Sequence, residues 1–176
     1  MPQSPITITS AEIIDLRVPT SDQMLGSDPF HKAPDYSSAV LHLETDSNLH
    51  GVSVVFTIGA GTDWMCHGIR DLCQLVIGTT LDEFTDSPFQ LYRRLIDHHQ
   101  LRWLHDGVFR MAAGAVLNAM WDLWAKSLNQ PLWKLLVDLE PEFVADCIDW
   151  RNLGDALTRE EAIALLQARR AEAPQR

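Results

Sequence analysis

The clearest pattern of apolar and polar positions lies in residues 108–136. Read at helical spacing, this stretch has a broad apolar face and only a narrow polar stripe. The apolar face consists of Ala112, Ala115, Val116, Ala119, Met120, Leu123 and Trp124. The polar stripe consists of Gly114, Asn118, Asp122 and Lys126. It places Asp122 one turn before Lys126, the order that favours an ion pair. The pattern predicts a helix that is covered on most of its circumference.

Alternation of apolar and polar residues predicts three strands in the first third of the chain. The predicted strands are residues 6–18, 39–45 and 51–57. In the first of them, Ile14, Leu16 and Val18 share one face, and Asp15 and Arg17 share the other. Short links between the strands favour an antiparallel meander of three strands.

After the third strand the pattern becomes helical. A helix is predicted from Thr62 or Asp63 through Val76, and Thr80 and Glu83 have the spacing of a capping box. Further helices are predicted to begin at the proline positions 88 and 131 and after a second capping box at 158–161. A chain that forms strands first and helices afterwards is expected to have an α+β fold.

Residues 143–150 interrupt the helical pattern. Their sequence is typical of a strand, yet they lie beyond the helices and have no evident partner strand. A helix is predicted to follow them. An unpaired strand followed by a helix resembles the first unit of a larger parallel structure.

Composition and charge narrow the class of protein. With 176 residues and 46% hydrophobic content, the chain is expected to bury one hydrophobic core and is short for a second full domain. It has no apolar run of membrane-spanning length, and the first residues, MPQSPITIT, lack the features of a signal or transit peptide. A net charge of −10 argues against nucleic acid as a partner. Three cysteines cannot all pair, and their sparseness favours a reducing compartment, the cytoplasm.

The long segment 20–36 shows neither the alternation of a strand nor the spacing of an amphipathic helix, and it is rich in Ser, Asp, Gly and Pro. A loop of this length in a short chain is usually functional or disordered. Its candidate binding groups are Gly26, Ser27, Asp28, Asp35 and Tyr36. They offer hydroxyl, carboxylate and backbone amide groups, which suit the recognition of a polyol or an acid. On the residues alone, a plain surface loop is an equally good interpretation.

Other candidate groups have simpler interpretations. Gly59 and Gly61 follow a strand and precede a helix, as in a dinucleotide-binding turn, but Trp64 stands where a third glycine is needed. Cys66 and His67 are adjacent on one predicted helix and point about 100° apart, so they cannot chelate one ion. The sequence contains no Ser-His-Asp set, metal-ligand cluster or phosphate loop of adequate specificity.

Several separated stretches resemble one family. The stretch AGAVLNAMWDLWAKSLNQPLWKLL resembles the one that closes the N-terminal capping domain in the mandelate racemase and muconate lactonizing branch of the enolase superfamily. Within that branch, VPTSDQMLGSDPFHKAPDYSSAVLHLETD, VVFTIGAGTD, QLRWL and CIDWRNLGDALTREEA resemble the L-fuconate dehydratases. The similarity extends from residue 6 to about residue 166, and several stretches in one order are more specific than a single motif.

The resemblance implies a capping domain in residues 1–140 and, in residues 141–176, the first strand and helix of a truncated (β/α) barrel. Members of this family bind Mg²⁺ on three barrel carboxylates and remove the proton α to a carboxylate with a Lys or His. In the dehydratases, β-elimination then gives a 2-keto-3-deoxy acid. Here Lys32, Lys126 and Lys134 are the only lysines, and they form no Lys-x-Lys motif. We therefore expect neither a catalytic base nor a metal ligand in this chain, and no activity from it alone.

By the same resemblance, the chain contributes the cap's share of a substrate pocket. Gly26, Ser27, Asp28 and Tyr36 match the substrate-contacting loop, and residues 57–63 match a second loop over the barrel mouth. The implied partners are a small sugar acid, the chain's own barrel domain and, as an open alternative, a second copy of the chain. The implied compartment is the cytoplasm, or the mitochondrion in a eukaryote.

Two other functions stay open at the level of the sequence. One is a non-catalytic binding or interaction module derived from the cap, and the other is a racemase or cycloisomerase of the same superfamily. A chain without its barrel would expose the apolar residues of 144–150 and part of the central helix, so we expect association or local disorder.

Overall fold

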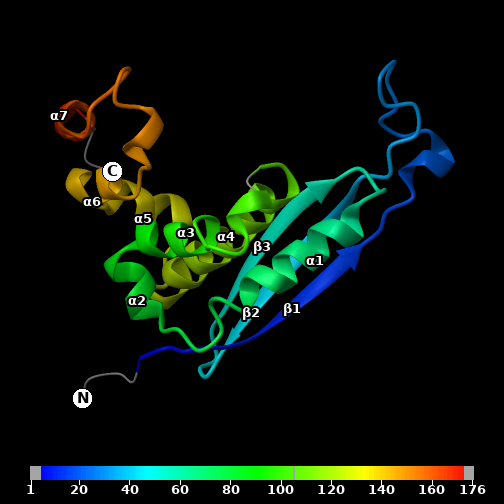
Figure 1. The fold of residues 1–176 in the computed structure, drawn as a ribbon, viewed down its shortest axis with the longest axis horizontal. Coiled ribbons are helices and arrows are strands. Elements are labelled where there is room, and N and C mark those ends of the chain that lie inside the picture. Colours follow the sequence, from blue (N-terminus) through cyan, green and yellow to red (C-terminus); the bar gives the residue numbers. More distant parts are fainter. Residues whose placement is uncertain (1–4, 105, 173–176) are drawn as a thin grey trace.

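A computed structural model describes residues 5–104 and 106–172 (Figure 1). Residues 1–4 and 173–176 lie outside the described residues. The first of these ranges is part of MPQSPITIT, the stretch that lacks the features of a signal or transit peptide. The strands are β1 (Ile8–Leu16), β2 (Ser37–Thr45) and β3 (His50–Thr57). The α-helices are α1 (Thr62–Cys73), α2 (Leu81–Asp86), α3 (Pro88–Ile96), α4 (Val108–Ser127), α5 (Leu132–Asp138), α6 (Pro141–Asp146) and α7 (Arg159–Glu172). Short 3-10 helices are η1 (Thr20–Gln23), η2 (Arg102–Leu104) and η3 (Trp150–Asn152). The expected α+β order, with three strands before the helices, is confirmed.

The three strands form an antiparallel sheet in the order β1-β2-β3, as predicted. Val40 at the centre of β2 lies opposite Ile14 on one side and Val54 on the other. One face of the sheet is buried by α1 and α4, through residues that include Ala39, Leu41 and Leu43. The other face, which carries Ile14 and Val54, remains exposed to solvent.

The helix predicted from the strongest pattern, α4, forms the centre of the core. Its small residues Ala112, Ala115 and Ala119 are buried, which lets neighbouring backbone approach closely. The approach is tightest at Gly51 of β3, where a Cβ atom would lie 2.2 Å from the carbonyl oxygen of Ala119. A side chain at position 51 would therefore push β3 away from α4.

The capping boxes read from the sequence are present. At the start of α2, the Glu83 amide donates to the Thr80 hydroxyl, and the Thr80 amide donates to the Glu83 carboxylate. Thr158 and Glu161 make the same pair of bonds before α7. The cap of α1 is different from the prediction, because Gly61 is its N-cap residue and neither Thr62 nor Asp63 caps it through a side chain.

The predicted strand at residues 143–150 is wrong. The helix α6 occupies the first part of this segment, and η3 begins at Trp150. Pro141 in the first turn favours a helix start. The Phe143 ring packs edge-on against Trp124, and the Trp150 indole donates to the carbonyl oxygen of Ala145 (2.9 Å). Tertiary contacts with α4 therefore override the local strand preference. The apolar residues of 144–150 are buried or half-buried, against the expectation that they would be exposed.

The C-terminal helix α7 packs against α6 largely through polar contacts. Arg170 pairs with Glu140 (2.6 Å), and Arg159 pairs with Asp146 (2.7 Å). Ala162 is the buried residue of this helix. Figure 1 shows α6, α7 and the segment between them at the opposite end of the molecule from the long loop of residues 20–36.

Candidate functional site

The long loop of residues 20–36 projects from the end of the sheet (Figure 1). Its two ends are joined by side chains. The Thr20 hydroxyl donates to the Pro34 carbonyl oxygen (2.7 Å) and accepts from the Tyr36 amide (3.0 Å). The amide and hydroxyl of Ser21 both donate to Asp35 Oδ1 (3.1 and 2.5 Å). These bonds lower the pKa of Asp35, because they favour its charged form.

Two of the predicted site residues, Gly26 and Tyr36, come together across this loop. The Tyr36 hydroxyl donates to the carbonyl oxygen of Gly26 (2.6 Å). Gly26 has φ +72°, and a Cβ atom there would lie 2.1 Å from the Tyr36 ring. Only glycine fits this position. The Tyr36 ring also contacts Phe56 at the end of β3, with 5.7 Å between centroids.

The other two predicted residues, Ser27 and Asp28, make local bonds in the same loop. The Ser27 hydroxyl donates to the Met24 carbonyl oxygen (2.8 Å). Asp28 Oδ1 accepts from the amides of Phe30 and His31 (2.8 and 2.7 Å), which lowers the pKa of Asp28. Asp28 therefore shapes the tip of the loop, where the Phe30 side chain is 91% exposed.

The second loop, residues 57–63, is folded around the carbonyl oxygen of Gly59. The Thr62 hydroxyl donates to this oxygen (2.7 Å) and also bonds to the Thr57 hydroxyl (2.7 Å). Gly59 and Gly61 both have positive φ, +103° and +87°. These glycines therefore allow the tight passage from β3 into α1.

The two loops lie side by side, and the sequence did not reveal the residue between them. Arg17 donates from Nη1 to the Gly59 carbonyl oxygen (2.6 Å) and from Nη2 to Asp15 (2.7 Å). The Arg17 hydrogen bond lowers the pKa of Asp15. In the second loop, the Ile58 carbonyl oxygen accepts from the Asp35 amide (3.3 Å). A small cavity of about 130 Å³ lies between the loops. In the sequence, Arg17 shows only a polar position in an alternating strand.

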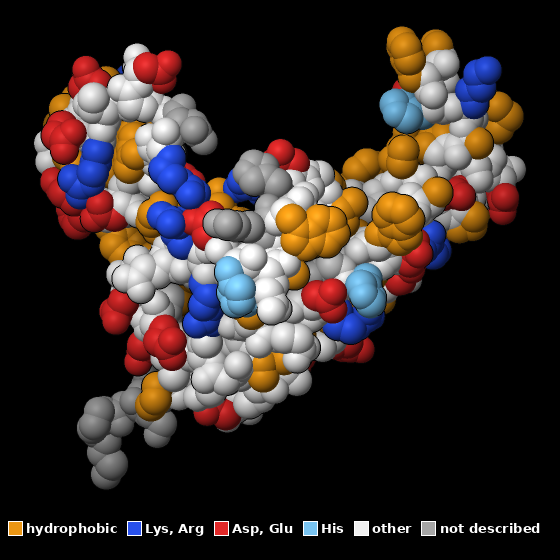
Figure 2. Space-filling model, in the orientation of Figure 1, with side chains coloured by type: hydrophobic (Ala, Val, Ile, Leu, Met, Phe, Trp, Pro, Cys, Tyr) orange, Lys and Arg blue, Asp and Glu red, His pale blue; other side chains and the backbone are white. Residues whose placement is uncertain are grey.

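The surface beside these loops is hollowed. Figure 2 shows a concave outline between the projecting loop and the C-terminal segment. A groove of about 840 Å³ runs along α1 and is lined by residues that include Trp64, Leu104, Val108 and Phe109. Trp64 is largely exposed on this groove. The groove is mostly apolar, which is typical of a surface that packs against another body.

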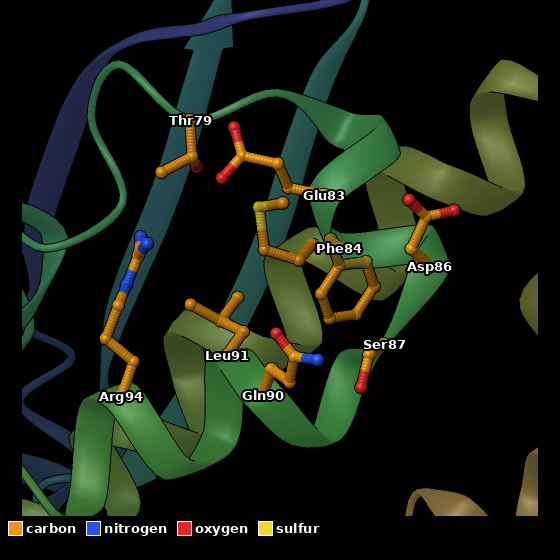
Figure 3. A pocket seen from close by; sticks show the side chains of 9 residues that line it. Thr79, Glu83, Phe84, Asp86, Ser87, Gln90, Leu91 and Arg94 are labelled. Carbon is orange, nitrogen blue, oxygen red and sulfur yellow. The ribbon is translucent and has the colours of Figure 1, made fainter.

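A separate pocket of about 350 Å³ lies between α2 and α3 (Figure 3). Thr79, Glu83 and Arg94 surround it, and Phe84 and Leu91 form part of its wall. Two of its three charged groups, those of Glu83 and Arg94, already have structural partners. Glu83 belongs to the capping box, and Arg94 donates to the carbonyl oxygen of Leu75. We therefore assign this pocket no role in binding.

Metal and thiol chemistry find little support in the described part of the chain. Among these residues, no group of three or more His, Cys, Asp or Glu side chains is placed to hold a metal ion. The thiols of Cys66, Cys73 and Cys147 are free. Burial raises the pKa of Cys73 to about 12 and that of Cys147 to about 11, so these two thiols are poor nucleophiles. No helix within residues 5–104 and 106–172 has the length and apolar character needed to cross a membrane.

Comparison with known proteins identifies the family. Residues 13–137 match the family model described as mandelate racemase / muconate lactonizing enzyme, N-terminal domain. The chain is 46% identical over 164 residues to mitochondrial enolase superfamily member 1 of Xenopus laevis, covering 91% of this chain and 37% of that protein. It is 43% identical over 170 residues to L-galactonate dehydratase of Hypocrea jecorina, covering 96% of this chain and 38% of that protein.

A solved structure agrees with these sequence matches. The crystal structure of human mitochondrial enolase superfamily member 1 superposes with a TM-score of 0.89 at 39% identity, covering 93% of this chain and 38% of that chain. The present chain thus spans less than two fifths of the length of these relatives. It belongs to the mandelate racemase and muconate lactonizing enzyme family of the enolase superfamily, as its N-terminal capping domain.

Proposed function

We propose that this chain is the substrate-recognising cap of a Mg²⁺-dependent acid-sugar dehydratase. The observation that carries the proposal is the juxtaposition of the loops 20–36 and 57–63 at one end of the sheet, beside the groove along α1. A cap in this position can close over a substrate that is held by a second body. Closure of this kind excludes water and completes a binding site.

The proposed substrate is L-fuconate. One relative, 43% identical over nearly the whole chain, is named an L-galactonate dehydratase. L-Fuconate has the configuration of L-galactonate at its stereocentres and differs at C6, where it carries a methyl group in place of a hydroxymethyl group. The proposed reaction removes the proton α to the carboxylate and eliminates water from the β position, which gives 2-keto-3-deoxy-L-fuconate.

The loop 20–36 supplies groups that suit such a molecule. The Tyr36 hydroxyl donates a hydrogen bond to the Gly26 carbonyl oxygen, and its own oxygen can still accept a hydrogen bond from a sugar hydroxyl. The hydroxyl of Ser27 and the carboxylate of Asp28 offer further acceptors. The exposed Phe30 at the tip offers an apolar surface to the C6 methyl group. These residues would bind and orient the substrate rather than react with it.

The residues that the structure describes do not fit the metal that the proposed reaction needs. The described residues bring together no set of three carboxylates or imidazoles. We therefore propose that the Mg²⁺ ligands and the base come from a barrel domain seated against the groove along α1, where Trp64 and Val108 are exposed. An L-talarate dehydratase from Polaromonas, solved with Mg and L-glucarate, shares this fold at 22% identity and a TM-score of 0.57.

The proposed compartment is the cytoplasm or the mitochondrion. The free thiols of Cys66, Cys73 and Cys147 suit a reducing environment. Two of the proteins compared above are named as mitochondrial members of the superfamily. Targeting of a tagged full reading frame in the source cell would decide between the two compartments.

A chimeric enzyme tests the function. Residues 1–140 of this chain replace the matching cap of the Hypocrea jecorina L-galactonate dehydratase, and the purified chimera is assayed with Mg²⁺. The substrates are L-fuconate, L-galactonate, mandelate and muconate. Dehydration of L-fuconate with a higher kcat/KM than L-galactonate would support the proposal. The native enzyme, with its own cap and the same barrel, is the control, and a difference in preference between the two enzymes reports the effect of the cap.

Other outcomes would point to the alternatives. A folded chimera that turns over mandelate or muconate and neither sugar acid would favour a racemase or cycloisomerase cap. A folded chimera without any turnover would favour a non-catalytic binding module. Preference for L-galactonate over L-fuconate would keep the dehydratase and overturn the proposed substrate.

A further inference from the structure

Two histidines meet on the outer face of the sheet, which is the face opposite α1 and α4. The imidazole rings of His42 in β2 and His50 in β3 have 5.9 Å between their centroids and 21° between their planes. We propose that these two side chains bind a divalent metal ion that prefers nitrogen ligands, such as Zn²⁺, with water in its other coordination positions. The site does not depend on the function proposed above and can be tested without substrate.

The register of the sheet places both histidines and two glutamates in one block. Glu12 of β1 lies opposite His42, and Glu44 of β2 lies opposite His50. His42 and Glu44 are two positions apart on β2, so their side chains point to the same face. Opposite residues of an antiparallel pair have Cβ atoms about 5 Å apart. Two imidazoles and two carboxylates therefore share a small area of the sheet.

The polar groups of this block have no partner elsewhere in the described part of the chain. Glu12, Glu44 and His50 are exposed, and His42 is half-buried. Within residues 5–104 and 106–172, no hydrogen bond or ion pair joins these four side chains to another residue. Their nitrogen and oxygen atoms can therefore turn toward an ion without breaking a bond of the fold.

The backbone that carries the two histidines is fixed at the turn and at the edge of the sheet. In the turn between β2 and β3, the Thr45 hydroxyl donates to the Leu49 carbonyl oxygen (2.6 Å), and the Leu49 amide donates to the Ser47 hydroxyl (3.1 Å). At the edge, Lys126 donates to the His50 carbonyl oxygen (3.0 Å). These bonds hold the register, so rotation of the side chains is sufficient to bring both imidazoles to one ion.

The separation of the two rings is close to that of imidazoles on a shared ion. Zinc binds imidazole nitrogen at about 2.0–2.1 Å in tetrahedral geometry, which puts the centroids of two bound rings about 5 Å apart. The observed separation of 5.9 Å is within about 1 Å of this value. Imidazole suits zinc and copper, whereas Mg²⁺ and Ca²⁺ prefer oxygen ligands. The two glutamates would add negative charge beside the ion and orient its water molecules.

The proposed site has two protein ligands. Among the described residues, no group of three or more His, Cys, Asp or Glu side chains is placed for a metal. Water therefore completes the coordination, and we expect weaker binding than at a structural zinc site with four protein ligands.

A second pair of contacting histidines supplies a control. His98 and His99, between α3 and η2, have 4.8 Å between ring centroids. They are consecutive residues, and His98 Nδ1 accepts from the Gln100 amide (3.4 Å). This pair lies outside the sheet and has no glutamate opposite it in a strand register. Removal of these two rings should therefore leave the proposed site intact.

The experiment is calorimetric titration of the 176-residue chain with Zn²⁺ at about pH 7.5, because zinc binds imidazole only in its neutral form. The variants are His42→Gln, His50→Gln and the control double variant His98→Gln with His99→Gln. We expect one Zn²⁺ per chain and a loss of affinity of about tenfold or more in each single variant, since either change destroys the chelate. The control variant should bind as the unsubstituted chain does, and Mg²⁺ should not bind at this site.

Thermal unfolding gives a second readout. Zn²⁺ at about ten times its Kd should raise the Tm of the unsubstituted chain by about 3–6 °C and leave that of His42→Gln unchanged.

Three results would overturn the site. They are no binding of Zn²⁺, an affinity that is unchanged in either single histidine variant, and loss of binding in the control double variant. The second result would show that the two rings do not share an ion, and the third would place the ion at His98 and His99.

Discussion

Asp122 of α4 accepts a hydrogen bond from the backbone amide of Val52 in β3, with 2.7 Å between Oδ2 and N. β3 is an edge strand of the described sheet, so this amide faces away from β2. Lys126, one turn later, pairs with Asp122 (2.6 Å) and donates to the carbonyl oxygen of His50 (3.0 Å). The ion pair expected from the sequence therefore also covers the edge of the sheet, which blocks pairing with another strand.

Removal of the Asp122 carboxylate should destabilise the whole domain. Asp122→Ala leaves the Val52 amide without its acceptor, and an unsatisfied, partly buried amide costs about 2 kcal/mol. We expect the free energy of unfolding in urea to fall by that amount. Asp138→Ala is the control, because Asp138 forms the same kind of helical pair with Lys134 on an exposed face. It should change stability by less than about 0.5 kcal/mol. Equal effects of both variants would contradict this role of Asp122.

Two glycine substitutions should have opposite effects. Gly26→Ala places a Cβ atom against the Tyr36 ring at positive φ, so we expect loss of the Tyr36 bond and about 1–2 kcal/mol of destabilisation. Gly114 of α4 has open space around it, and Gly114→Ala should stabilise the chain by about 0.5–1 kcal/mol. Thermal unfolding measures both changes, and proteolysis of residues 20–36 should accelerate in Gly26→Ala alone. A stable Gly26→Ala variant with an intact loop would show that the loop adapts.

The sequence was sufficient where local patterns decide the structure. Alternation predicted the three strands, helical spacing predicted α4, and the Thr80–Glu83 box marked the start of α2. These features depend on residues that are close in the chain. The resemblance to a capping domain, which required several separated stretches together, was also confirmed.

What the sequence could not predict depends on distant contacts. Arg17 and Gly59 are 42 positions apart, and no local pattern relates them. The segment 143–150 has the composition of a strand, but its first part belongs to α6, where Phe143 packs on Trp124. Of the candidate site, the sequence placed Gly26 and Tyr36 in one loop, whereas the bond between them appears only in three dimensions.

The attachment of the C-terminal segment should weaken in acid. Arg151 bonds to Asp149 and to Asp97 at the end of α3, and its hydrogen bond lowers the pKa of Asp149 from 3.8 to about 2. A carboxyl group whose pKa is lowered by folding stabilises the fold at any pH above the pKa that it has in the unfolded chain. This stabilisation is lost as the pH falls toward 2, the pKa in the folded chain. Asp149→Asn should therefore lower Tm at pH 5, and the difference from the unsubstituted chain should shrink between pH 4 and pH 2. A difference that does not change with pH would contradict this linkage.

Self-association of the isolated chain is expected from α5 rather than from residues 144–150. Trp133, Leu136 and Val137 of α5 are large side chains exposed to solvent, and an apolar patch of this kind promotes contact between copies. Light scattering after size-exclusion chromatography should give a mass above the 19.9 kDa of one chain. The double variant Trp133→Ser with Val137→Ser should return the chain to a monomer. Phe30→Ser removes an even more exposed side chain at the loop tip and should leave the mass unchanged. A monomer before any substitution would show that α5 tolerates its exposure.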